Sequence, residues 1–134
     1  MLTIRDPADL GQVADPFLRV LIGERLADMA QGEDFDPEVH GYVLVLEPGD
    51  DLAEVEAAFG APLLANPVTH LTFGQPGFRP VFEYVGAHPG WFEVVAVPGD
   101  GDFGVVLFVP DLPGIDPRLL ALCAVHSAAE SRAV

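Results

Sequence analysis

The sequence predicts an α+β fold: a mostly antiparallel sheet that includes a three-stranded meander in the C-terminal half, with about three helices packed on one face. The first observation is a recurrent Asp-Pro pair, which marks where helices begin. The second is a series of short apolar stretches joined by turn residues. The third is a length of 134 residues without an internal repeat or a domain-sized linker, so we expect residues 1–134 to form a single domain.

Aspartate followed by proline predicts the beginning of a helix. The carboxylate accepts hydrogen bonds from the free N–H groups of the first turn, and proline fits the first helical position. Asp15-Pro16 is the clearest case, because the residues after it place apolar side chains on one helical face, with Arg25 inside that stripe. A capping-box pattern at Asp51 and Glu54 predicts a second helix. The predicted helices span residues 16–31, 51–59 and 117–130, with single turns after Asp6-Pro7 and Asp36-Pro37.

Strands are predicted from apolar runs between turn residues. Residues 42–46 are apolar on both faces, which is typical of a central strand that is covered on both sides. The links at 86–90 and 98–102 are too short for a crossover, so the strands that they join are antiparallel neighbours. The meander consists of residues 81–85, 91–97 and 104–109, and the alternating run 68–73 is a further predicted strand.

The charge balance limits the class of partner. The chain has 21 acidic residues, six arginines and no lysine, which gives a formal charge of −15. Such a charge repels nucleic acid and anionic membranes, so we expect neither as a partner, and it favours a basic protein. The chain has no apolar run long enough to span a membrane, and it has no secretory signal pattern. Its single cysteine, Cys123, excludes an internal disulfide. We therefore expect a cytoplasmic protein.

Acidic residues are concentrated between Arg25 and Arg79, where no lysine or arginine occurs. This stretch predicts one continuous negative surface. The residues expected to bind a partner there are Asp34, Asp36, Glu38, Asp50, Asp51 and Glu54.

A pocket between the sheet and a helix is the alternative site. Its candidate residues are His70, His88, Trp91, Glu83 and Glu93, which accompany most of the aromatic residues of the second half of the chain. Two carboxylates on neighbouring strands are suited to acid–base chemistry. Strand alternation, however, favours Glu83 and Glu93 on the solvent face of the meander, where they would be ordinary surface acids.

Two further motifs favour structural interpretations. Gly99, Gly101 and Gly104 spell GxGxxG, but a strand follows instead of the helix that a dinucleotide site needs, so the motif predicts a turn. Cys123 and His126 stand three residues apart without a second pair of ligands, so we expect no metal site and no cofactor. The apolar residues around Cys123 predict a buried thiol and not a nucleophile.

Two functions follow from these patterns. The leading hypothesis is a non-catalytic binding or regulatory protein that engages a basic protein, as inhibitors, immunity proteins and mobile-element accessory proteins do. The alternative is a small-molecule-binding domain or modest enzyme with an aromatic-lined pocket. Half of the residues are hydrophobic, which also predicts a homodimer through the apolar side of the meander or the last helix.

Overall fold

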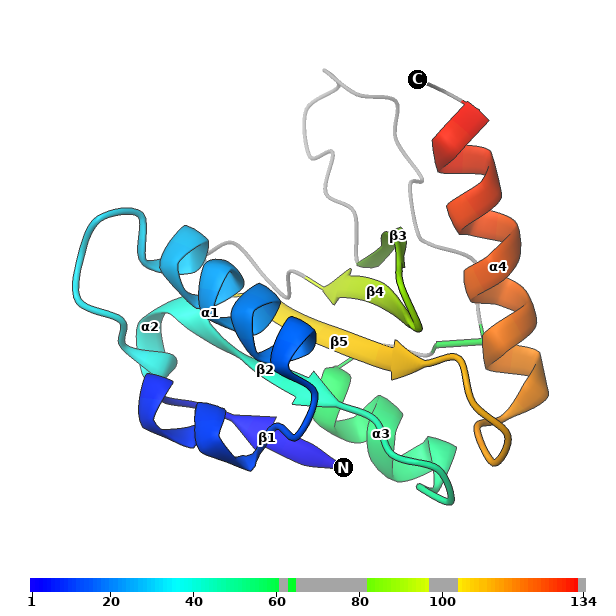
Figure 1. The fold of residues 1–134 in the computed structure, drawn as a ribbon, viewed down its shortest axis with the longest axis horizontal. Helices are drawn as coiled ribbons and strands as arrows, with labels where there is room; N and C mark the ends of the chain where they lie inside the picture. The colour runs from blue at the N-terminus through cyan, green and yellow to red at the C-terminus, as the bar shows by residue number, and fades with distance from the viewer. Residues whose placement is uncertain (61–62, 65–81, 97–103, 133–134) are drawn as a thin grey trace.

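A five-stranded mixed sheet forms the centre of the protein (Figure 1). The computed structural model describes residues 1–60, 63–64, 82–96 and 104–132. In spatial order the strands are β1 (Leu2–Ile4), β2 (Gly41–Val45), β5 (Gly104–Pro110), β4 (Trp91–Ala96) and β3 (Phe82–His88). Only β2 and β5 pair in parallel among the described strands, and β3, β4 and β5 form the predicted antiparallel meander. The predicted α+β class is therefore confirmed.

The helices begin where the aspartates predict them. The carboxylates of Asp15, Asp36 and Asp51 each accept a hydrogen bond from a backbone N–H of the first turn. These bonds satisfy donors that have no partner inside the helix. The helical segments are a 3-10 helix η1 (Pro7–Gln12), then α1 (Pro16–Ala30), α2 (Pro37–His40), α3 (Leu52–Phe59) and α4 (Pro117–Arg132).

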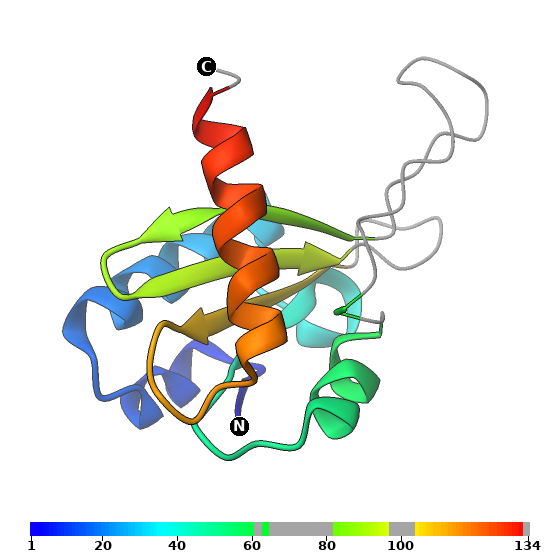
Figure 2. The ribbon, with the colours of Figure 1, turned by 90° about the vertical axis from the view of Figure 1, so that its right-hand side faces the viewer.

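Helices cover both faces of the sheet, so the expectation of one covered face is wrong. Figure 2 shows α4 in front of the sheet and α1 behind it. The side chains of β2 explain this arrangement, because Val43 and Val45 belong to the core beneath α1, whereas Leu44 and Leu46 belong to the core beneath α3 and α4. The covered central strand is confirmed, and the chain needs apolar layers on both sides to bury it.

The meander carries α4 on one face, so its apolar side is not free for the predicted homodimer. Leu119 and Cys123 of α4 are fully buried in one core with Val94 of β4. The predicted burial of Cys123 is therefore confirmed. None of the helices in the described ranges is long and apolar enough to cross a membrane.

Two features of the strands differ from the prediction. β1 pairs with β2 but was not predicted, since three residues are too few to establish an alternating pattern. β3 continues to His88, which places His88 directly opposite Trp91 across a tight turn at Gly90, whose φ is 82°. The predicted strand at residues 68–73 lies outside the described residues.

Candidate functional site

A buried ionic cluster joins α1 to the meander. The guanidinium of Arg25 donates two hydrogen bonds to Glu93, from Nε to Oε2 at 2.6 Å and from Nη2 to Oε1 at 2.9 Å. The Nε2 atom of His88 donates to Oε1 of Glu93 at 2.8 Å. Only 1% of the Glu93 side chain is exposed, so the expectation that it lies on the solvent face is wrong.

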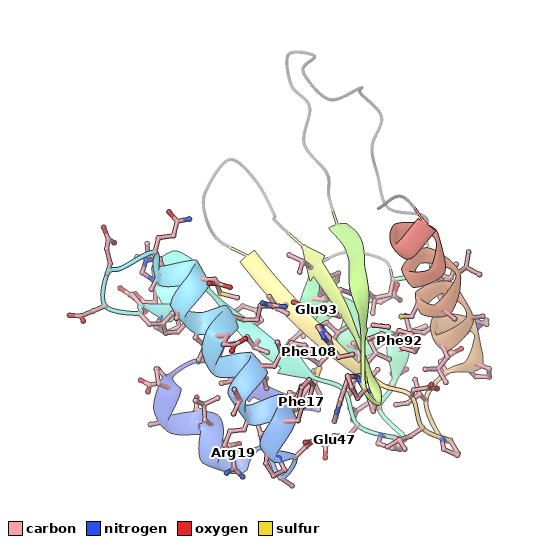
Figure 3. All side chains as sticks on the ribbon, turned by 45° about the horizontal axis from the view of Figure 1, so that its top comes forward. Phe17, Arg19, Glu47, Phe92, Glu93 and Phe108 are labelled. Atoms are coloured by element: carbon pink, nitrogen blue, oxygen red, sulfur yellow. The ribbon has the colours of Figure 1, made fainter. Side chains whose placement is uncertain are left out.

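The alternation of β4 explains how Glu93 comes to be buried. Trp91 and Glu93 face α1, whereas Phe92 packs with α3 and α4 (Figure 3). Glu93 stands opposite Phe108 of β5 in the register, beneath the helix that carries Arg25. The alternation was predicted correctly, but α1 covers the face that was expected to meet solvent.

The electrostatics of the cluster keep Glu93 ionised. Burial alone raises the pKa of a carboxyl group, but the hydrogen bonds from Arg25 and His88 outweigh it and lower the pKa of Glu93 below its usual value. The same contact raises the pKa of Arg25. Because the carboxylate accepts three hydrogen bonds away from solvent, it can hold Arg25 and His88 in place but has no proton to give a substrate.

A second contact fixes the tight turn of the meander to the beginning of α1. The indole Nε1 of Trp91 donates to Oδ2 of Asp15 at 2.9 Å, while Oδ1 of Asp15 accepts from the backbone N–H of Phe17. The hydrogen bond from Trp91 is the main cause of the lowered pKa of Asp15. The ring of His88 lies near Phe17, with ring centroids 6.5 Å apart. The aromatic turn therefore packs against a capped helix end.

Three of the five predicted pocket residues lie close together on the β3–β4 hairpin. His88 and Glu93 are in contact, and Trp91 stands beside them on the same hairpin. The side chain of Glu83 and the whole of His70 lie outside the described residues. Sequence reasoning missed Arg25 and Asp15 as members of this site. Arg25 had one visible signal, its place inside the apolar stripe of a helix, which indicates a buried anionic partner.

Protein-family models, curated proteins and solved structures were compared with the chain, and none of them matches it.

The predicted acidic residues form two separate groups. Asp34, Asp36 and Glu38 precede β2, and Asp50, Asp51 and Glu54 follow it, so the groups lie at opposite ends of this strand (Figure 1). Five residues of strand span about 17 Å, which is more than the Debye length of about 8 Å in physiological salt. The expected continuous surface is therefore divided in two.

The first group lies on a structured loop, residues 33–38, which we call the acidic loop. The backbone N–H of Asp36 donates to Nδ1 of His40 at 2.9 Å, and the N–H of His40 returns a bond to the carbonyl of Asp36 at 2.8 Å. His40 is buried and its ring packs against Phe35. The side chains of Asp34 and Glu38 are exposed, and the backbone N–H of Glu38 donates to Oδ1 of Asp36 at 2.9 Å.

In the second group, Asp50, Asp51 and Glu54, two of the three carboxylates accept hydrogen bonds from other parts of the chain. Asp50 accepts hydrogen bonds from the amino group of Met1 and from the backbone N–H of Glu47. Asp51 caps α3. Of this group, Glu54 alone carries an exposed carboxylate without a described partner.

An apolar groove lies beside the acidic loop, and we call it the α1–η1 groove. Its volume is about 370 Å³. It runs between the 3-10 helix and the C-terminal half of α1, and the acidic loop contributes to it. Its lining includes Pro7, Leu10, Gly23, Leu26, Ala27, Ala30, Glu33 and Phe35.

The arginines with described side chains do not neutralise the acidic loop, where Nε2 of His40 lies 3.8 Å from Oε2 of Glu33. Each of the four arginines with a described side chain has its closest contact elsewhere. Arg5 lies over the Tyr42 ring, Arg19 donates to the carbonyl of Val13, Arg25 holds Glu93 and Arg118 pairs with Asp116.

Metal binding and nucleophilic chemistry are two further types of site that the described residues could form. No group of three or more His, Cys, Asp or Glu side chains is arranged there to hold a metal ion. Burial raises the pKa of the Cys123 thiol to about 12, so this cysteine is not a nucleophile near neutral pH.

Proposed function

We propose that the protein is a non-catalytic binding protein that engages a basic segment of a partner protein at the acidic loop and the α1–η1 groove. The observation that carries the proposal is the apolar groove beside solvent-facing carboxylates. Exposed acids alone are common on soluble domains, but an adjacent apolar groove supplies the contact area that a bound segment needs.

Charge and apolar contact have separate roles in this proposal. The carboxylates of Asp34, Asp36 and Glu38 attract a basic partner over several ångströms and raise its association rate. The groove then holds apolar side chains and slows dissociation. Because His40 and Asp36 already fix the loop by hydrogen bonds, little ordering is needed on binding.

The chemistry of the strongly shifted groups also supports binding over catalysis. Glu93 is buried and saturated with hydrogen bonds, and Cys123 is buried among apolar side chains. A catalytic group must be able to reach its substrate. The net charge and the lone cysteine lead us further to propose a cytoplasmic location without a nucleic-acid or membrane partner.

Two charge-matched variants test the proposal. D34N/D36N/E38Q removes three charges from the acidic loop, and D50N/D51N/E54Q removes three from the opposite end of β2. A basic protein is captured from the native host, purified, and its association measured by surface plasmon resonance at two salt concentrations. We expect the loop variant to slow association about tenfold at low salt, and the matched variant to stay close to wild type.

A second pair of variants tests the groove. Ala27→Gln places a polar side chain in the α1–η1 groove, and Ala53→Gln makes the same change on α3, outside it. Ala27→Gln should increase the dissociation rate, and Ala53→Gln should not. If the two triple variants slow association equally, only the net charge matters. If neither pair differs from wild type, the acidic loop is only a solvated surface.

A homodimer remains a proposal for the last helix alone, because the meander is covered. The side chain of Val125 on α4 is 63% exposed and could contact a second copy of the chain. Light scattering at high protein concentration tests it: twice the mass of the chain supports the dimer, and the mass of one chain contradicts it.

A further inference from the structure

A second apolar groove lies at the other end of β2, and we call it the strand-end groove. It opens where the parallel strands β2 and β5 both end, beside the first residues of α1, and its volume is about 320 Å³. In open sheets, ligands bind in the crevice outside the carboxyl ends of parallel strands. The size is at the small end of the range for ligand pockets. The apolar side chains of its lining include Leu2, Val13, Leu18, Pro48, Pro110 and Leu112.

The polar groups of this groove are mainly acidic. The carboxylates of Asp15 and Glu47 line it, together with Gln12. Oδ2 of Asp15 accepts one described hydrogen bond, from Trp91, although a carboxylate oxygen has two acceptor positions. This atom therefore keeps an acceptor position beside an aromatic ring.

The charges around the groove give it a negative balance. Asp50 shares the Met1 amino group with the lining Glu47, and two described cations contact residues of the lining, the Met1 amino group and Arg19. The first of these is held between Glu47 and Asp50, and the second by the carbonyl of Val13. The three carboxylates of Asp15, Glu47 and Asp50 therefore stand against two cations that already have partners.

We infer that the strand-end groove binds a small apolar cation, a primary ammonium ion with an aliphatic or aromatic body. The apolar walls take the body, and the ammonium group donates to Asp15 and Glu47. Trp91, which also lines the groove, adds an aromatic wall for the apolar body. The inference does not rest on the proposed function, because this groove and the acidic loop lie at opposite ends of β2.

Trp91 provides the assay, since it is the only tryptophan of the chain. The probes are hexylammonium, hexanol and hexanoate, which share one alkyl chain and differ in charge. We expect a saturable change in tryptophan emission with hexylammonium, and affinity at least about tenfold weaker for hexanoate because of its repulsion by the carboxylates. Hexanol should bind with intermediate affinity.

Matched surface variants locate the binding. Leu112→Ala shortens an apolar wall of the groove, and Val125→Ala makes a similar change on α4 away from it; both side chains are exposed, so the fold should persist. Glu47→Gln removes a lining charge, and Glu24→Gln removes one from the exposed face of α1. We expect Leu112→Ala and Glu47→Gln to weaken hexylammonium binding about threefold or more, and both controls to leave it unchanged.

An emission response that does not saturate with hexylammonium overturns the inference. So do equal responses to hexylammonium and hexanoate, and a loss of affinity that is the same in the groove variants and in their controls. A lysine-containing peptide that binds while hexylammonium does not also overturns it, since it shows that the acidic rim recruits proteins without a small-molecule site.

Discussion

Removing the guanidinium of Arg25 should destabilise the fold more than removing it together with the carboxylate that it neutralises. Arg25→Met leaves the carboxylate of Glu93, which is 1% exposed, with His88 as its one remaining described partner. Breaking a buried ion pair from one side costs about 3–5 kcal/mol. Because 27% of the Arg25 side chain is exposed and His88 stays in place, we expect about 3 kcal/mol, at the lower end of that range.

The double variant Arg25→Met/Glu93→Met removes both charges and fills their volume with apolar groups. Replacing a buried pair in this way is often close to neutral, so we expect a loss of about 1 kcal/mol. Glu93→Met alone should cost about 1–2 kcal/mol, since Arg25 keeps access to water and to Asp28 at 3.6 Å. The coupling between the two positions should therefore reach about 3–4 kcal/mol, the summed losses of the single variants less the loss of the double variant.

Urea unfolding at pH 7 and 25 °C measures these differences, with the m value as a check that the denatured state is unchanged. The melting temperature of Arg25→Met should fall by roughly 10 °C. If the losses of the two single variants add up to the loss of the double variant, the cluster is no stronger than a surface ion pair, and the reasoning is refuted.

Acid should reduce the difference in unfolding free energy between wild type and Arg25→Met. The pKa of Glu93 is lowered in the folded protein, so its contribution to stability is present above the ordinary value of 4.5 and is lost as the pH falls through the folded pKa. The gap in unfolding free energy between the two proteins should be full at pH 7 and should shrink toward about pH 3. A gap that stays constant over this range contradicts the assignment.

Three other predictions follow from single features. Gly41→Ala should lower the free energy of unfolding by more than about 4 kcal/mol or abolish folding, because a Cβ atom there would lie 1.7 Å from the carbonyl oxygen of Gly104. Gly49→Ala, at a φ of 90° but in open space, should lower it by only about 1 kcal/mol. Urea unfolding measures both losses. Cys123 should resist Ellman's reagent in the folded protein and react in urea, because burial raises its pKa to about 12. Sodium chloride up to ~0.2 M should raise the melting temperature at pH 7, because it screens a net charge of −15; a flat or falling midpoint contradicts this.

Local signals were predicted well from the sequence. The caps at Asp15, Asp36 and Asp51 need only the neighbouring residues to form, so the helices begin where the Asp-Pro pairs and the capping box indicate. The strands of the meander were likewise found from short turns, although β3 extends further than its apolar run suggested. His88, which was predicted to lie in the link at 86–90, is instead the last residue of β3 and pairs with Trp91.

The errors concern contacts between distant parts of the chain. Alternation shows that Trp91 and Glu93 share a face, but it does not show which face another element covers, so Glu93 was placed in solvent. Its partner Arg25 lies 68 positions away, and Asp15 lies 76 positions from Trp91. The acids around β2 were expected to act together because they are close in sequence, yet an extended strand separates its two ends.

The parallel pairing of β2 with β5 has a consequence for synthesis on the ribosome. Each residue of β2 pairs with a residue 63 positions later in the chain. At about 5–20 residues per second, the nascent chain waits roughly 3–13 s after making β2 before its neighbour exists. During that time β2, with apolar residues on both faces, has only the three-residue β1 as a strand partner among the segments described. The other edge of β2 is then unpaired and can pair with a second chain, so we expect the nascent chain to aggregate more readily than the folded protein. Pairing with β5 covers this edge and removes the opportunity.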